Sequence, residues 1–209
     1  MKVMVVDDEP DIVDLLKLML GSQGYDVITA CGGSECLEKL QQDMPDLILL
    51  DIIMSDIDGW TVLSRIRQDE RLKSIPVVIL TAKQLTAEVA QKKAPYITEY
   101  LVKPITKEGL LSVIENIISS SKKIEDFIAA ARKAGVDQDI IDKYVQLNQQ
   151  TGAYKRLHTS LTQIYTKKKL EREKSIKNTM DSIKRLIDLR ERDLTKLHAR
   201  IEEMIAASG

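Results

Sequence analysis

Four short apolar runs in the first half of the chain each end in polar residues of types that bind phosphate or metal ions. The runs lack polar alternation, which is typical of parallel strands covered on both faces. The carboxyl ends of such strands meet along one edge of a sheet, so we expect the polar residues to converge there. They are Asp7 and Asp8 after Lys2–Val6, Asp51 after Leu47–Leu50, Thr81 after Pro76–Leu80, and Lys103 after Tyr100–Val102.

Three carboxylates at one edge repel one another unless a cation lies between them. Carboxylate oxygens that leave room for water and phosphate suit Mg²⁺. An ionised carboxylate beside such a cation can attack a phosphoryl donor and form an acyl phosphate. A lysine ammonium and a threonine hydroxyl nearby can hold the transferred oxygens and stabilise the charge on them. The pattern therefore predicts phosphoryl transfer with Mg²⁺.

Ordinary structural roles also explain each feature separately. Asp7–Asp11 is a good helix start, with acidic residues near the positive end of the helix and Pro10 in its first turn. Asp51 alone fits a loop acid, and Lys103-Pro104 fits a strand exit. All four features nevertheless occur in order, each after a different strand, which favours one shared site.

The elements that must position these residues alternate between apolar runs and amphipathic stretches. With a further run at Tyr25–Thr29, five strand–helix units over residues 1–120 predict a doubly wound α/β domain with a five-stranded parallel sheet. The expected helices are Ile12–Leu20, Glu35–Leu40, Trp60–Ile66, Thr86–Lys93 and Lys107–Ser119.

Residues 1–120 resemble a response-regulator receiver domain of two-component signalling, of the flavodoxin-like, single-domain chemotaxis-regulator type. No family is recognised for the remainder of the chain. The resemblance lies in Val5–Pro10, Pro45–Met54, Asp58–Trp60, Ile79–Lys83 and Tyr100–Ile105.

The resemblance implies a phosphoacceptor and a metal site. It implies that Asp51 takes the phosphoryl group from a sensor histidine kinase. It also implies that Asp7, Asp8, Asp51 and the backbone carbonyl of Ile53 surround Mg²⁺. The chain would then catalyse its own phosphorylation and dephosphorylation, and would not be an enzyme toward other substrates.

The resemblance further implies a switch. Thr81 and Lys103 would contact the phosphoryl group, and the Lys103-Pro104 peptide bond would be cis. Tyr100, three residues before Lys103, matches the aromatic residue that turns inward when the threonine moves.

Two departures from the family pattern concern the loops. The family often has proline where this chain has Ser55, and the usual small-residue turn is replaced by Ala94–Glu99. Ile53 and Lys83 occupy the two positions that commonly tune hydrolysis in the family. Because the apolar Ile53 side chain cannot orient an attacking water, we expect slow self-dephosphorylation.

Charge divides the 209-residue chain into two parts. The formal net charge is −1, but residues 1–120 carry 12 basic and 19 acidic residues and sum to −7, whereas residues 121–209 carry 19 and 13 and sum to +6. This asymmetry and the polar stretch Ser119–Lys123, taken as a hinge, predict a receiver domain over 1–120 and a helical output segment over 121–209.

The sequence gives no sign of export or of a membrane partner. It has no signal peptide and no apolar stretch approaching the roughly 18–20 residues that span a bilayer. The two cysteines, Cys31 and Cys36, form no metal-ligand set with His158 or His198. A cytoplasmic location is therefore expected.

The second half lacks strand signals. One helical stripe, Ile124–Ala131, is stopped by Gly135, and another, Ile140–Leu147, is expected to end near Gly152. A helix-compatible segment then runs from Tyr154 almost to the terminus. Its last part has a heptad seam of steps of four and three, a coiled-coil-like pattern with one charged member. The seam positions are Ile176, Met180, Ile183, Ile187, Arg190, Leu194, Leu197, Ile201 and Met204.

The seam permits two structures. A homodimer through a coiled coil is favoured over an intramolecular bundle that uses the same stripe, and signalling would then proceed by protein–protein interaction. The charged stretch Lys167–Lys174 interrupts the heptad phase, which predicts a stutter or hinge.

Other output functions are less well supported by the sequence. The basic residues Lys167–Lys169, Arg185, Arg190 and Arg192 are candidate phosphate contacts for nucleic acid, but acidic residues interleave with them and no helix-turn-helix is recognisable. A phosphorelay role for His158 or His198 lacks a known acceptor motif. The segment also has no glycine-rich phosphate loop and no nucleophile–base pair for an enzyme.

Overall fold

A computed structural model describes residues 1–82, 89, 92–93, 96–164 and 174–208 of the chain. The described residues form two compact units. The first contains the sheet and extends to Leu110, and the second contains the helical residues from Leu111 onward. None of the described helices is long and apolar enough to cross a bilayer.

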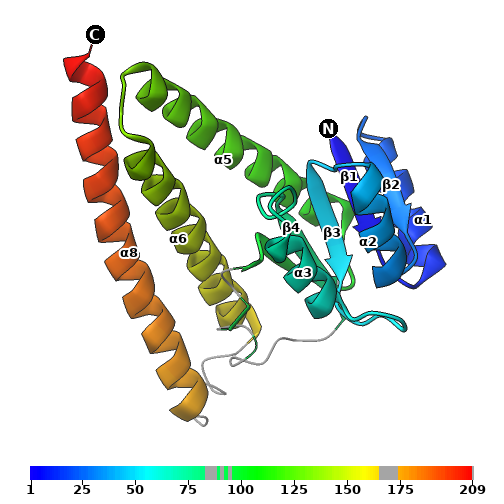
Figure 1. Ribbon diagram of the computed structural model, residues 1–209. Helices are drawn as coiled ribbons and strands as arrows, with labels where there is room; N and C mark the ends of the chain where they lie inside the picture. The colour runs from blue at the N-terminus through cyan, green and yellow to red at the C-terminus, as the bar shows by residue number, and fades with distance from the viewer. Residues whose placement is uncertain (83–88, 90–91, 94–95, 165–173, 209) are drawn as a thin grey trace. The chain divides into compact units, whose positions relative to one another are not determined.

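The first unit contains the predicted five-stranded parallel sheet (Figure 1). Its strand order is β2-β1-β3-β4-β5, with parallel pairing throughout. This order is that of a flavodoxin-like doubly wound fold, in which ligands bind at the carboxyl ends of the strands. The strands are β1 (Lys2–Val6), β2 (Asp26–Ala30), β3 (Leu47–Asp51), β4 (Val77–Thr81) and β5 (Glu99–Val102).

The central strands form the core of this unit. Val3–Val6 of β1 and Leu47–Leu50 of β3 have no exposed side-chain surface, and Val77–Ile79 of β4 is equally buried. Burial on both faces explains why these strands read as unbroken apolar runs. The helices that cover the sheet include α1 (Pro10–Gly21), α2 (Gly33–Gln42) and α3 (Gly59–Gln68). Most of the predicted helix Thr86–Lys93 lies outside the described residues, although Val89, Lys92 and Lys93 are helical.

The helix that follows β5 is longer than predicted. The sequence predicts an end at Ser119, but α5 runs without a break from Lys107 to Lys133. The Ser119 hydroxyl donates a hydrogen bond to the Glu115 carbonyl (2.7 Å), so this serine bonds to its own helix and does not interrupt it. The expected break in secondary structure is therefore wrong, while the domain boundary at residue 120 stays a prediction. The helix stops before Gly135, which has a positive φ of 75°.

The next helix is also longer than predicted. The expected end near Gly152 is wrong, because α6 extends from Gln138 to Ile164. The buried Thr151 hydroxyl bonds back to the Leu147 carbonyl (2.6 Å). A Cβ atom at Gly152 would lie 2.8 Å from the guanidinium of Arg156, which therefore packs over the glycine. Packing in this turn outweighs the low helix propensity of glycine.

The heptad seam lies on α8 (Lys174–Ala207), which packs beside α6 (Figure 1). Four seam residues, Met180, Ile183, Ile187 and Ile201, are at most 9% exposed. Leu194, Leu197 and Met204 pack against a core cluster of buried residues from all three helices of this unit. The stripe is thus covered within a single chain. The Ile176 side chain and residues 165–173, with most of the predicted stutter, lie outside the described residues.

Candidate functional site

Three carboxylates meet at the carboxyl ends of β1 and β3, as predicted. One oxygen each from Asp7, Asp8 and Asp51 lies within 4.8 Å of the others. Asp7 has no exposed surface and Asp51 is 3% exposed, whereas Asp8 is half-buried. The parallel register that pairs Val6 with Leu50 brings the two strand ends level. This is a set of hard oxygen donors that fits a divalent cation.

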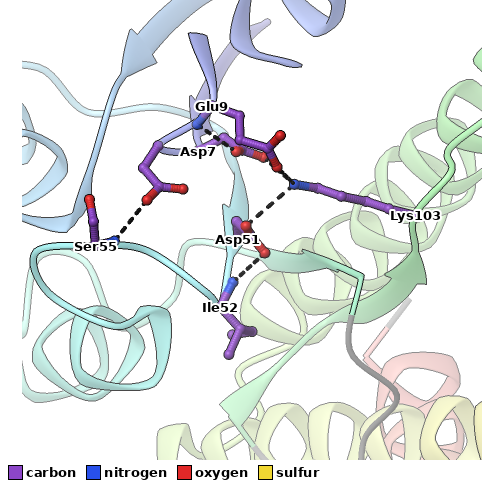
Figure 2. Close-up of polar contacts among 7 residues, drawn as sticks. Asp7, Glu9, Asp51, Ile52, Ser55 and Lys103 are labelled. Carbon is purple, nitrogen blue, oxygen red and sulfur yellow. Dashed lines mark hydrogen bonds and ion pairs between the residues drawn. The ribbon is translucent and has the colours of Figure 1, made fainter. Parts of the chain in front are cut away.

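Lys103 supplies the positive charge in this cluster. Its ammonium donates hydrogen bonds to Asp7 (2.6 Å) and Asp51 (3.3 Å), and it lies 3.7 Å from Glu9. Figure 2 shows the lysine reaching toward both buried carboxylates. Burial by itself lowers the pKa of Lys103, but the hydrogen bond to Asp7 and the charges of Asp51 and Asp7 outweigh it, so the pKa is raised. The ammonium therefore stays charged through the neutral range.

The Asp51 carboxyl is less acidic than usual. Burial raises its pKa, and the charge of Asp7 acts in the same direction. Lys103 and the backbone N–H groups of Ile52 and Ile53 oppose this effect without cancelling it. One Asp51 oxygen accepts the Ile52 N–H at 2.7 Å. The group is therefore a desolvated carboxylate with one oxygen tied to the main chain, which suits a nucleophile that must keep a fixed orientation.

The loop between β3 and α3 packs closely against the main chain of Asp51. The Gly59 N–H donates to the Ile52 carbonyl (3.0 Å), which closes the loop at its base. A Cβ atom at Gly59 would lie 2.1 Å from the Asp51 carbonyl oxygen, so the close approach requires glycine. Asp58 then starts α3 by accepting the N–H groups of Trp60 and Thr61.

Two contacts of this loop lay beyond what residue types could predict. The Ser55 N–H donates to an Asp8 oxygen at 2.8 Å. The Asp56 carboxylate accepts the N–H groups of Gly33 (3.0 Å) and Ser34 (2.8 Å) at the start of α2. Both contacts use main-chain N–H donors, which every residue except proline has. The one available signal was that Ser55, unlike proline, has an N–H to donate.

Strands β4 and β5 carry two more of the predicted site residues, Thr81 and Tyr100. Thr81 ends β4, and the adjacent strand β5 places Tyr100 opposite Ile79. Tyr100 is 7% exposed, and the Lys103–Pro104 peptide bond is cis. The Ile53 side chain, two residues after Asp51, is 52% exposed. Lys83 and the segment Ala94–Pro95 lie outside the described residues.

Candidate residues of the helical unit take part in its packing. The His198 ring stacks on Phe127 with 4.2 Å between centroids, and its Nδ1 lies 3.0 Å from the Tyr144 hydroxyl. Arg190 donates a hydrogen bond to the Gln150 side chain of α6. Its guanidinium therefore has a partner within the helical bundle. Lys167–Lys169 lie outside the described residues. A relay role for His158 or His198 stays an untested prediction.

Two family descriptions match the chain. Residues 3–115 match the response regulator receiver domain. Residues 120–204 match a family described as Metanogen output domain 2, which covers the helical segment for which the sequence suggested no family.

Individual relatives match the first part of the chain. The chain is 34% identical to protein PilG of Pseudomonas aeruginosa, over 59% of this chain and 93% of PilG. It is 35% identical to the DNA-binding dual master transcriptional regulator RpaA of Synechocystis, over 59% of this chain and 51% of that protein. It thus spans about half the length of RpaA. The crystal structure of chemotaxis protein CheY4 of Vibrio cholerae matches 55% of this chain and 96% of its own, with 32% identity and a TM-score of 0.52.

We predict that Lys103→Met strongly destabilises the first unit. The substitution leaves the buried Asp7 and Asp51 carboxylates without a counter-charge, and breaking such a pair costs roughly 3–5 kcal/mol. The free energy of unfolding can be measured in urea through the fluorescence of Trp60, the one tryptophan of the chain, which lies in α3. A divalent cation should restore part of the loss, because it can neutralise the same carboxylates.

The matched control is Lys73→Met. Lys73 forms an exposed ion pair with Glu70, and such surface pairs contribute at most about 1 kcal/mol. Equal losses for the two variants would contradict a special role for Lys103.

Proposed function

The chain belongs to the response regulator receiver family, and from this premise we propose that it accepts a phosphoryl group on Asp51 with Mg²⁺ and signals through its helical C-terminal segment. The family makes it a component of a two-component phosphorelay, with a histidine kinase as phosphodonor, and not a conventional enzyme. The cluster of Asp7, Asp8 and Asp51, two of which bind the Lys103 ammonium, carries the proposal.

The proposed transfer uses Oδ2 of Asp51, the oxygen that Lys103 contacts, as the nucleophile. This oxygen attacks the phosphorus of a phosphohistidine, the P–O bond forms, and the P–N bond breaks as the imidazole leaves. A Mg²⁺ ion held by Asp7, Asp8 and Asp51 would supply positive charge to the phosphoryl oxygens. The contact between Lys103 and Asp51 supports the proposal that this ammonium pairs with a new phosphoryl oxygen. Transfer adds roughly −1.5 to −2 charge at this position.

The proposed switch follows from the strand register. Thr81 at the end of β4 would bind a phosphoryl oxygen, and Tyr100 lies one strand away, opposite the residue two positions before Thr81. A movement at the end of β4 would therefore reach the packing around Tyr100, which is buried. Change in that packing is the route by which we propose phosphorylation alters the protein surface.

Asp51→Asn should abolish phosphorylation. Acetyl phosphate and Mg²⁺ should add one phosphoryl mass to the wild-type protein, measured on the intact chain, because a carboxylate oxygen is available. The amide oxygen of asparagine is too weak a nucleophile to replace it. Asp11→Asn, an exposed change on α1, is the matched control and should label like wild type. Equal labelling of the Asp51 variant would refute the proposed acceptor.

We also propose that the acyl phosphate is long-lived. The Ile53 side chain is half exposed beside the site and has no polar atom to orient a water molecule. Ile53→Asn should therefore speed loss of the phosphoryl group by at least about 10-fold, since positioned polar groups contribute up to about 10²–10⁴-fold to such steps. Ile53→Val should keep the slow rate. Decay of the intact phosphorylated mass gives both rates, and a wild-type lifetime of seconds would contradict the proposal.

The helical segment, in this proposal, acts as a folded bundle that contacts a partner protein. Its seam is buried in one chain, so a coiled-coil homodimer through the same stripe requires the bundle to open. The match of residues 120–204 to an output domain family supports an output role for this segment.

Light scattering should show a monomer for the unphosphorylated full chain, because the seam is already covered. Ile183→Asp places a charge at a site with no exposed surface and should unfold the helical unit. Leu189→Asp, on the same helix but 56% exposed, should leave both mass and melting unchanged. A wild-type dimer would contradict the closed bundle. Repeating the measurement with beryllofluoride and Mg²⁺ tests whether activation opens it.

A further inference from the structure

The three acidic residues of the site differ in what holds them. Asp7 is bound by Lys103 and by the N–H of Glu9 (3.1 Å), and Asp51 is bound by Lys103 and the Ile52 N–H. Asp8 is half-buried and has no such lysine contact among the described residues. The contact that fixes its carboxylate in this part of the chain is the Ser55 N–H, at 2.8 Å from Oδ2.

The loop that carries this N–H is itself held at several points. The Gly59 N–H closes its base against Ile52. One residue beyond Ser55, the Asp56 carboxylate binds two N–H groups at the start of α2, and these bonds keep the pKa of Asp56 well below its usual range. Figure 2 shows Ser55 at the side of the cluster away from Lys103. The contacts at Asp56 and Gly59 therefore hold the part of the loop that carries the Ser55 N–H.

We propose that the main-chain N–H of Ser55 is a positioning group of the metal site. It holds Oδ2 of Asp8 and leaves Oδ1 free to face the cation, so the carboxylate does not lose rotational freedom when the ion binds. The inference rests on the proposed metal site at Asp7, Asp8 and Asp51. It depends on the main chain, and the Ser55 hydroxyl has no part in it. A chain with proline at this position has no N–H and cannot form the contact.

If the Ser55 N–H has this role, two substitutions at Ser55 should differ in their effect on Mg²⁺ affinity. Hydrogen bonds that orient a ligating carboxylate affect metal affinity by about 10- to 100-fold when removed. Ser55→Pro removes the N–H and should weaken Mg²⁺ binding by about 10-fold. Ser55→Ala removes the hydroxyl but keeps the N–H, and should bind Mg²⁺ within twofold of wild type.

The experiment is a calorimetric Mg²⁺ titration of the full chain and both variants, with urea unfolding followed through Trp60. Weaker binding by Ser55→Pro without loss of unfolding free energy supports a positioning role, because a general structural defect would lower both. Equal or tighter binding by Ser55→Pro overturns the inference, as does weakening by Ser55→Ala to the same extent. A wild-type chain that binds no Mg²⁺ refutes the proposed metal site itself, which separates the two failures.

A second measurement does not depend on how well the proline variant folds. The exposed Ser55 amide of the metal-free wild-type protein should exchange its hydrogen slowly, because Asp8 accepts it. Asp8→Ala removes the acceptor and should speed exchange at Ser55 while amides of α3 keep their wild-type rates. Equal Ser55 exchange rates in the two proteins would overturn the inference.

Discussion

The first unit depends on compensating two carboxylates that the sheet forces into its interior. Asp7 and Asp51 lie at the ends of neighbouring central strands, and each is at most 3% exposed to solvent. Two like charges at this depth are costly unless a counter-charge accompanies them. Lys103 provides it from a third strand end, so one ammonium links segments that are far apart in sequence. The same two carboxylates, together with Asp8, form the set of oxygen donors that fits a divalent cation.

The sheet was predictable because its signal is local and strong. Each central strand is a run of about five aliphatic residues, and such runs have few alternatives in a parallel α/β fold. The helix ends were less predictable, since they depend on contacts that composition does not reveal. The serines after residue 118 suggested a break, yet Ser119 bonds to its own helix. Gly152 suggested a stop, yet Arg156 packs over it and the helix continues.

The candidate site also has parts that the sequence predicts and parts that it does not. Its carboxylates and its ammonium could be predicted because these groups are visible in the sequence at the strand ends. The loop that orients them could not, because the donors at Ile52, Ser55 and Gly59 are main-chain N–H groups common to almost every residue. What matters there is the path of the loop, which Asp56 fixes by a contact 23 positions away along the chain. Sequence patterns identify the reacting groups better than the hydrogen bonds that hold them.

The heptad stripe shows why a correct pattern can leave the structure undecided. Apolar residues at alternate steps of three and four need burial, and a second copy or a neighbouring helix of the same chain satisfies that need equally well. Arg190 distinguishes the two arrangements. A charged residue in a seam is costly unless its hydrogen-bond donors are paired, and here Gln150 of α6 accepts from its guanidinium. Because this partner comes from the helix beside α8 in the same chain, the polar contact fits the intramolecular register, and a dimer through the stripe would have to supply a replacement.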